Sequence, residues 1–283
     1  MDYRKATSAD ISKIILLWEE LFGDPEDCVT HFITHFGIET CYVCEINSKI
    51  VAIAFALPTL LILPSNFDEE LVERGNFYKN LPVKYLYACG THPKHRKQGI
   101  MQILLATIYD DAYRENVAGV FLSAATPHLA NYYRKLGFED FFYRNHFWYY
   151  KDILLAEETP PVNVINFISP KTYLKKRVKM LESTCFVNWN EDFFRFINNE
   201  KTQLCEYKDT IFSCKTEFNK IVVDEFLGDM PKEHLARLLI EHFPDFETVH
   251  IRSQGNEYCC GQIKWCKYLE KQPKNGYFVF AME

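Results

Sequence analysis

The segment Cys89-Gly90-Thr91-His92-Pro93-Lys94-His95-Arg96-Lys97-Gln98-Gly99-Ile100-Met101 carries the strongest fold signal in this chain. An apolar and aromatic stretch over 83–90 comes before it, and an apolar face with helical spacing follows over 99–116. Polar residues and one proline lie between the two. The pattern therefore predicts a strand, a loop over 91–98 and a helix.

The start of this helix is a predicted anion site. A helix N-terminus exposes about four unpaired backbone N–H groups and roughly half a positive charge, which suits a phosphate group. Lys94, Arg96 and Lys97 add positive side chains, and Gly99 lets a pyrophosphate approach the backbone closely. For this segment alone, the alternative is a basic loop with a glycine at a helix start.

A second segment, Thr126-Pro127-His128-Leu129-Ala130-Asn131-Tyr132-Tyr133-Arg134-Lys135-Leu136-Gly137-Phe138, predicts another helix, with Pro127 in its first turn and Gly137 at its end. Together the two segments resemble the GCN5-related N-acetyltransferase (GNAT) superfamily. Residues 96–101 resemble its coenzyme A pyrophosphate loop, Arg/Gln-x-x-Gly-x-Gly/Ala. Residues 133–138 resemble its Tyr-x-x-x-Gly-Phe element, and the resemblance covers residues 1–150.

One residue departs from the loop pattern. Met101 stands in place of the last small residue, where it can lie on the helix flank without blocking the amides. In this feature and in its two-part organisation the chain is similar to bacterial acetyltransferases of the enhanced-intracellular-survival type. The resemblance implies an α/β (α+β) fold, with a mixed central sheet flanked by helices and a second, smaller α/β domain that could be a degenerate GNAT-like half.

The resemblance also implies a mechanism. Acetyl-CoA, as co-substrate, would lie in a gap between the strands 83–90 and 117–125, with its pantetheine arm near Cys89 and Thr91. An amine would attack the thioester directly, and Tyr133 would protonate the departing thiolate. The pyrophosphate would bind the loop and the first helical turn, which contain Arg96, Lys97, Gln98, Gly99, Ile100, Met101 and Gln102.

Acid–base chemistry agrees with a tyrosine as the acid. A thiolate whose thiol has a pKa near about 8.5 needs only a weak acid, and a phenol with a pKa near about 10 serves if it is well placed. Tyr132 is the neighbour with which Tyr133 could be confused. One helical step turns the side chain by about 100°, so only one of the two can face the gap.

The general base is harder to assign. The strand 84–89 contains no Asp or Glu, although the attacking nitrogen must lose a proton. The resemblance to the survival-type enzymes implies the terminal carboxylate at Glu283 as one candidate. A water chain is another, in which case the apolar segment 276–283 is simply a core strand that ends there.

The sequence predicts two domains, 1–150 and 166–283, joined by a linker over 151–165 that contains Pro160 and Pro161. Consecutive prolines continue neither a helix nor a central strand. The order of elements after the linker loosely repeats that of 50–125, and this half would wall the acceptor pocket. Its closest strand-to-helix turn, 228–231, is acidic, so we expect no second acetyl-CoA there.

Local patterns predict the remaining elements, and the segment 64–82 is irregular. The helices are expected at 8–23, 25–36, 127–137, 170–182, 190–203 and 231–243, and the strands at 2–5, 40–46, 50–63, 117–125, 138–150, 209–217, 220–227, 248–254, 261–269 and 276–282.

Composition argues against several function classes. The formal net charge of −6 lacks the basic excess of most nucleic-acid-binding proteins. The longest apolar run, 50–63, is too short for a membrane helix, and the first residues lack a signal-peptide core. We therefore expect a cytoplasmic protein whose ten cysteines are reduced. Cys41 and Cys44 have zinc-like spacing but no second pair, so no metal is expected.

Two functions remain from different classes. The leading hypothesis is an N-acetyltransferase whose acceptor is a primary amine of a small molecule or a peptide. The alternative is a non-catalytic acyl-CoA-binding regulatory module, which the missing strand carboxylate and the imperfect loop favour. The oligomeric state is left open.

Overall fold

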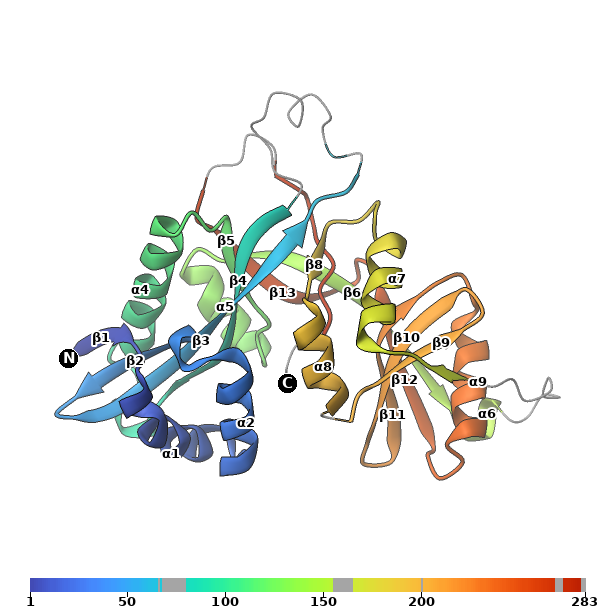
Figure 1. Ribbon diagram of the computed structural model, residues 1–283, viewed down its shortest axis with the longest axis horizontal. Coiled ribbons are helices and arrows are strands. Elements are labelled where there is room, and N and C mark those ends of the chain that lie inside the picture. Colours follow the sequence, from blue (N-terminus) through green and yellow to red (C-terminus); the bar gives the residue numbers. More distant parts are fainter. Residues whose placement is uncertain (66, 68–79, 155–164, 200, 268–271, 281–283) are drawn as a thin grey trace.

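The protein folds around one continuous mixed sheet. The computed structural model describes residues 1–65, 67, 80–154, 165–199, 201–267 and 272–280. In these ranges thirteen strands join in the order β1-β2-β3-β4-β5-β13-β6-β12-β11-β10-β9-β7, with β8 paired to β3. Figure 1 shows β6 and β13 in the middle of the molecule, between the N-terminal strands and the strands β9 to β12.

The mixed α/β character expected from the sequence is confirmed. The strands are β1 (Asp2–Lys5), β2 (Cys41–Ile46), β3 (Lys49–Ile62), β4 (Asn80–Thr91), β5 (Gly119–Leu122), β6 (Glu139–Tyr150), β7 (Asn166–Phe167), β8 (Phe186–Asn188), β9 (Gln203–Tyr207), β10 (Thr210–Glu217), β11 (Lys220–Leu227), β12 (Thr248–Gln254) and β13 (Tyr258–Trp265). The helices are α1 (Ile11–Phe22), α2 (Glu26–Phe36), α4 (Ile100–Arg114), α5 (Pro127–Lys135), α6 (Lys151–Leu154), α7 (Pro170–Met180), α8 (Glu191–Asn199) and α9 (Lys232–His242).

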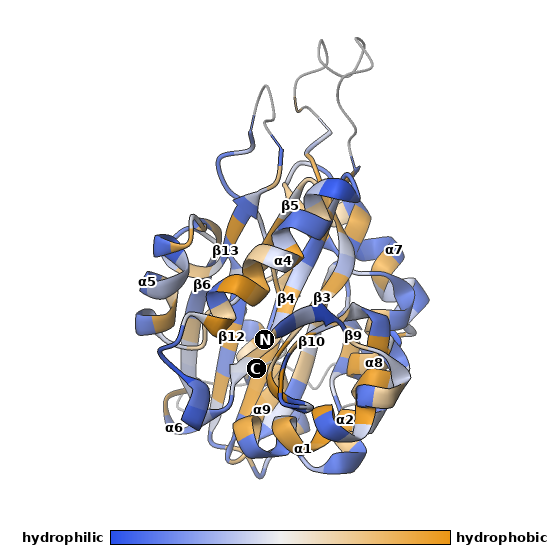
Figure 2. Cartoon of the chain, turned by 90° about the vertical axis from the view of Figure 1, so that its left-hand side faces the viewer, coloured by the Kyte–Doolittle hydropathy of each residue, from blue (hydrophilic) through white to orange (hydrophobic). Residues whose placement is uncertain are grey.

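Helices cover both faces of the N-terminal part of the sheet. The apolar stripe of α4, which includes Leu104 and Ile108, packs on one face together with α5. Trp18 of α1 and Phe32 of α2 pack on the other face. Figure 2 shows apolar residues along the central strands and polar residues on the outer sides of the helices. Among the described helices, none is both long and apolar enough to span a membrane.

The C-terminal half repeats the strand arrangement of the N-terminal half. β9, β10 and β11 are antiparallel neighbours, and β12 pairs in parallel with β11 after the intervening helix α9. In the same way β2, β3 and β4 are antiparallel, and β5 pairs in parallel with β4 after α4. The loose repeat expected from the sequence is thus visible in the topology.

The last strand connects the two halves. β13 lies between β5 and β6 and is antiparallel to both. β12 pairs with the other edge of β6, and β8 pairs with β3, so four strand pairings among the described residues cross the expected domain boundary. Residues 151–154 of the expected linker form α6, and residues 155–164 lie outside the described residues. The division into domains 1–150 and 166–283 stays a prediction.

Two of the expected elements are wrong in part. The helix expected over 190–203 ends at Asn199, and β9 begins at Gln203. The expected strand 276–282 does not form within the described residues, where Gly276 and Tyr277 make only isolated bridges. The rings that follow explain this difference, because Phe278 and Phe280 pack into the aromatic core, on side chains from β4 and α8, rather than along a strand.

A buried ion pair holds α7 on the C-terminal sheet. Arg177 and Glu225 are both 0% exposed, with Nε of Arg177 2.9 Å from Oε1 of Glu225. The hydroxyl of Tyr173 donates to Oε2 at 2.9 Å, and Nη1 of Arg177 donates to the carbonyl of Val187 at 3.0 Å. These bonds link α7, β11 and the strand β8 that lies on β3.

Candidate active site

In the N-terminal half, the parallel strands β4 and β5 diverge from each other. β4 and β5 pair only where residues 83–85 lie beside residues 119–121. β5 ends at Leu122, whereas β4 continues to Thr91 with β3 on one side. Beyond Tyr85, none of the described strands pairs with the other side of β4. The gap expected between these two strands is therefore present in the fold.

A β-bulge turns the backbone of β4 beside this gap. The register against β3 shifts between Tyr87 and Gly90, so that Ala88 and Cys89 share one partner. Ala88 has φ +48°, a left-handed conformation that is uncommon for a residue with a side chain. Bulges re-aim groups of a strand and are frequent next to active sites.

The parting strands border a cavity of about 360 Å³, which we call the central cavity. Its walls come from β4, from the end of β5 and the residues after it, from α5 and from the end of α1. A volume of this size falls in the range of small-ligand sites, which are mostly apolar with a few polar groups. The aromatic side chains that line it are Trp18, Phe22, Tyr85, Tyr87 and Tyr133.

Tyr133 is the tyrosine of α5 that faces the central cavity. Its side chain lines the cavity and the residue is 7% exposed, whereas Tyr132 does not line it. Burial raises the pKa of Tyr133 well above its usual value of 10, and the neighbouring Cys89 adds to the shift. The hydroxyl therefore keeps its proton until a strong enough base appears beside it.

Cys89 lies on the bulge and also lines the central cavity. Burial raises the pKa of its thiol to about 12, although a hydrogen bond from Tyr133 acts in the opposite direction. At neutral pH only about one thiol in 10⁵ would be ionised. The burial and the raised pKa of the Cys89 thiol therefore favour a packing and positioning role over an acyl-enzyme route.

The expected anion loop is held in shape by its own polar groups. Nε of Arg96 donates to the carbonyl of Thr91 at 3.0 Å, and Nδ1 of His92 accepts from the amide of Lys94 at 3.2 Å. A short 3₁₀ turn over Pro93–His95 lies between these contacts. Lys97 has φ +63°, so the chain turns sharply before the helix.

The helix start is open where the sequence predicts a pyrophosphate. α4 begins at Ile100, and Gly99 precedes it with φ +75°. A side-chain carbon added at Gly99 would meet nothing within 4 Å. Met101 packs partly buried against the core cluster beneath α4, so it lies on the helix flank as expected. The first-turn amides, including that of Gln102, have no partner within the helix.

Asp24 is a cavity residue that the sequence reasoning missed. It follows the glycine that ends α1 and lines the central cavity. Nε1 of Trp18 donates to its Oδ2 at 2.8 Å, which fixes the carboxylate beside the aromatic rings. No sequence motif links it to β4, since more than fifty residues lie between Asp24 and that strand. It supplies a carboxylate at a cavity whose central strand has none.

The other expected catalytic group lies outside the described residues. Glu283 belongs to the segment 281–283, so its role stays a prediction. No group of three or more His, Cys, Asp or Glu side chains that could hold a metal ion occurs in the described part of the chain.

In the C-terminal half, an ion pair joins β11 and β12, the two strands that correspond to β4 and β5. β11 and β12 pair only over residues 220–223 and 248–251, and a bulge follows at Asp224 of β11. Nη1 of Arg252 on β12 lies 2.7 Å from Oδ1 of Asp224, which ties the two strands together. This contact supports the prediction that the C-terminal half binds no second acetyl-CoA.

Comparison with known proteins identifies a segment of the N-terminal half. Residues 74–141 match the family model of the acetyltransferase (GNAT) domain. The chain carries a GNAT acetyltransferase domain. The matched residues contain β4 with its bulge, the anion loop and the helix with Tyr133. The expected family and the expected class of acyltransferase are confirmed. No curated protein matches the chain by sequence.

Solved structures share the two-part GNAT fold. The GCN5-related N-acetyltransferase from Kribbella flavida is 15% identical, with a TM-score of 0.68 over 93% of this chain and 69% of its own length. Eis1 from Mycobacterium abscessus is 12% identical, with a TM-score of 0.64 over 94% of this chain and 74% of its own. A tandem GNAT protein from the clavulanic acid biosynthesis pathway is 11% identical, with a TM-score of 0.55 over 95% of this chain and 99% of its own.

These likenesses extend past the GNAT domain to nearly the whole chain. The repeat of β2 to β5 by β9 to β12 is therefore that of a tandem GNAT fold, and in the second copy an ion pair joins the two strands that correspond to β4 and β5.

Proposed function

We propose that this GNAT protein moves an acetyl group from acetyl-CoA to a primary amine by direct attack, with Tyr133 as the general acid. One observation carries the proposal: a single cavity contains both the bulge of β4 and the side chain of Tyr133. A thioester bound along the unpaired side of β4 would then have its sulfur within the same cavity as a protonated phenol.

The chain offers backbone groups to each part of the co-substrate. The amides of residues 97–102 and the side chain of Lys97 would hold the pyrophosphate at the start of α4. The pantetheine amides would pair with the unpaired side of β4 near Cys89 and Thr91, as an added strand does. The reacting carbonyl would then lie beside the bulge.

The proposed reaction has one bond formed and one broken. The amine nitrogen bonds to the thioester carbon, the carbon–sulfur bond breaks, and the sulfur takes the proton of Tyr133. Tyr133 regains a proton from water, and the nitrogen releases its surplus proton to water at the cavity mouth. Glu283 stays the alternative acceptor of that proton.

Asp24 supports a cationic amine as the acceptor. It is an exposed carboxylate at the mouth of a cavity lined with aromatic rings. Carboxylates and aromatic faces both attract an ammonium group, the aromatic faces by about 0.5–2 kcal/mol. Asp24 would therefore draw in a protonated amine, which loses its proton before it attacks.

The test compares binding with turnover. Calorimetry should find one acetyl-CoA per chain, and incubation with acetyl-CoA and a panel of primary amines should release free thiol in step with acetylated amine. Binding without thiol release would favour the acyl-CoA-binding regulatory module instead. A stoichiometry of two would contradict the proposal that the C-terminal half is free of acetyl-CoA.

A further inference from the structure

A cavity of about 240 Å³ lies between α4 and the end of α5. We call it the lysine cavity, because Lys135 of α5 and Lys264 of β13 line it. Its other walls are mostly apolar and contain Leu105, Ala106, Tyr109, Val120, Leu136 and Phe138. None of the described residues that line it is an Asp or a Glu. Neither sequence motif of the GNAT domain accounts for the two lysines.

The lysine cavity begins at the first turn of α4. Gln102 lines it and is the third residue of that helix. Leu105, Ala106 and Tyr109 continue the wall along the same helix, which advances about 10 Å over these residues at 1.5 Å each. The amide of Gln102 is among those that would hold the pyrophosphate. The lysine cavity is therefore next to the proposed pyrophosphate site.

The fold positions Lys264 in the cavity without the help of an ion pair. Its Nζ lies over the ring of Tyr109, 4.3 Å from the ring centroid. The hydroxyl of Tyr109 donates to the carbonyl of Trp265 at 2.7 Å, which fixes the ring beside β13. Lys264 is the partner of Val120 in the pairing of β13 with β5. It forms no ion pair with any of the described residues.

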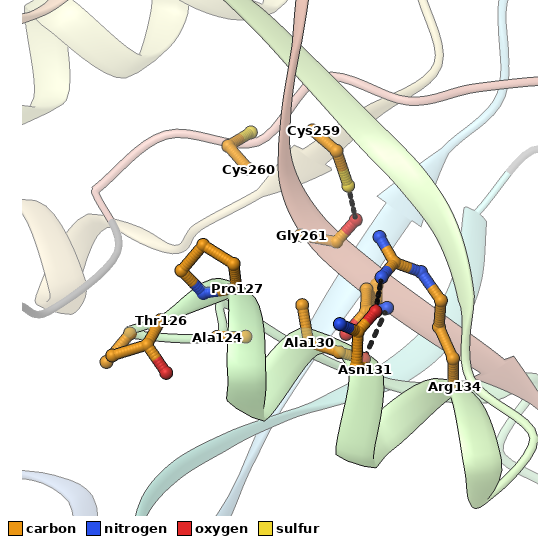
Figure 3. A pocket seen from close by; sticks show the side chains of 11 residues that line it. Ala124, Thr126, Pro127, Ala130, Asn131, Arg134, Cys259, Cys260 and Gly261 are labelled. Carbon is orange, nitrogen blue, oxygen red and sulfur yellow. Dashed lines mark hydrogen bonds between the residues drawn. The ribbon is translucent and has the colours of Figure 1, made fainter.

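Lys135 also lacks a counter-ion, in contrast to the arginine before it. Lys135 is exposed at the end of α5 and forms no ion pair within the described part of the chain. Figure 3 shows Arg134 beside Asn131, to which its Nη1 donates at 2.6 Å. Nη2 of Arg134 lies 2.7 Å from Oδ2 of Asp140. The nearby carboxylate is thus engaged by Arg134, and the lysine cavity keeps two uncompensated positive side chains.

Coenzyme A has an anionic group that fits this arrangement. One ribose ring separates its pyrophosphate from its 3′-phosphate, and a phosphate monoester carries about −1.5 to −2 charges near pH 7. Two cations beside a bound pyrophosphate complement such a group in charge. The adenine ring on the same ribose suits the apolar and aromatic walls of the cavity.

We propose that the lysine cavity binds the adenosine 3′-phosphate end of acetyl-CoA, and that Lys264 and Lys135 hold the phosphate. This inference rests on the proposed function and deepens it, because it makes the chain specific for thioesters of coenzyme A over the same thioesters without the 3′-phosphate. It also gives the C-terminal half a direct part in co-substrate binding. Strand β13 supplies Lys264, although the match to the GNAT family model ends at residue 141.

Calorimetry on the full chain compares coenzyme A with 3′-dephospho-coenzyme A. Coenzyme A should bind about 10-fold more tightly, the combined scale of two partly exposed ion pairs. Equal dissociation constants would overturn the inference and leave the proposed transferase intact. Failure of both ligands to bind at millimolar concentration would refute the proposed transferase, and the inference with it.

Two lysine variants locate the discrimination. Lys264→Gln and Lys135→Gln should each weaken the binding of coenzyme A about 3-fold and leave the dissociation constant of 3′-dephospho-coenzyme A unchanged. Lys171→Gln is the matched control, because it removes the same charge from the exposed start of α7 and lines neither the lysine cavity nor the central cavity. Lysines that only stabilise the ring of Tyr109 or the end of α5 would alter thermal melting but not the ratio of the two dissociation constants. An unchanged ratio in both variants would overturn the inference.

A further variant tests the place of the phosphate rather than its charge. Ala106 is exposed on α4 and lines the lysine cavity, whereas the next residue, Thr107, does not line it. Ala106→Leu should reduce the preference for coenzyme A, and Thr107→Leu should retain it. A full preference in folded Ala106→Leu, as judged by thermal melting, would place the 3′-phosphate outside the lysine cavity and overturn the inference.

Discussion

The variant Gly99→Ala, compared with Gly23→Ala, tests whether Gly99 contributes to acetyl-CoA binding or only to the backbone conformation at the start of α4. Gly99 precedes α4 with φ +75° and ψ 3°, and an added side-chain carbon would meet nothing within 4 Å. Gly23 ends α1 with φ +81° and ψ 5°, and its added carbon would also meet open space. The two positions share one conformational cost, so Gly23→Ala is a matched control for Gly99→Ala.

The two variants should differ only in their affinity for acetyl-CoA. A left-handed conformation costs an L-residue about 1–2 kcal/mol, which each variant should lose from its free energy of unfolding. At Gly99 the added methyl also occupies the open space where we expect the pyrophosphate. Loss of one hydrogen bond to a charged group is worth about 1.5–3 kcal/mol. The dissociation constant of acetyl-CoA should therefore rise about 10- to 100-fold in Gly99→Ala alone.

Thermal melting and calorimetry measure the two effects separately. Both variants should melt about 2–8 °C below the natural protein, at about 2–4 °C for each kcal/mol lost. Only Gly99→Ala should bind acetyl-CoA more weakly. Equal dissociation constants for the two folded variants would refute the assignment of the loop as the pyrophosphate site.

Four further predictions concern the acid, the acceptor, the core and the terminus. Tyr133→Phe should lower turnover about 10²–10⁴-fold with acetyl-CoA affinity retained, and Tyr132→Phe should not. Because burial raises the pKa of Tyr133, its acid form is lost only as pH rises beyond about 10; an alkaline fall of kcat below that pH which disappears in Tyr133→Phe would contradict the raised pKa, whereas unchanged turnover in Tyr133→Phe would contradict the role. Asp24→Asn should raise the KM of cationic amines about 2- to 5-fold, the scale of an exposed ion pair, with Asp27→Asn as the control on net charge; the same rise in both variants would count against Asp24. Arg177→Met leaves Glu225 buried without its partner and should cost about 3–5 kcal/mol in urea unfolding, whereas Arg177→Met with Glu225→Leu should recover most of it; a single variant as stable as the natural protein would show that the pair contributes little. Residues appended after Glu283 would displace the terminal carboxylate by about 3.3 Å each and should reduce turnover but not acetyl-CoA affinity; full activity would remove that carboxylate from the mechanism.

The parts of the site that were predictable from sequence depend on local signals. The loop before α4 and the helix with Tyr133 each lie within one short segment, and their residue types follow from local backbone needs. Gly99 adopts a positive φ at a helix start, and Gly137 does so just past a helix end. Periodicity also located most helices and strands of the N-terminal half, because each buries one face.

The parts that were not predictable depend on contacts between distant segments. Asp24 becomes a cavity residue only because α1 packs on β4, which no pattern near Asp24 reveals. Lys264 reaches α4 only because β13 pairs with β5. The side chains of residues 278–280 alternate little in polarity, so a packed aromatic segment and a buried strand have the same sequence pattern.

The position of β13 sets the order in which the protein can be completed during translation. β5 and β6 leave the ribosome early, but the strand that separates them is made near the end of the chain. At about 5–20 residues per second, several seconds pass before it appears. Throughout that interval both neighbours present an unpaired edge, which invites pairing with other chains. Nascent chains should therefore depend on chaperones, and a fragment cut after β6 should aggregate rather than serve as a minimal enzyme.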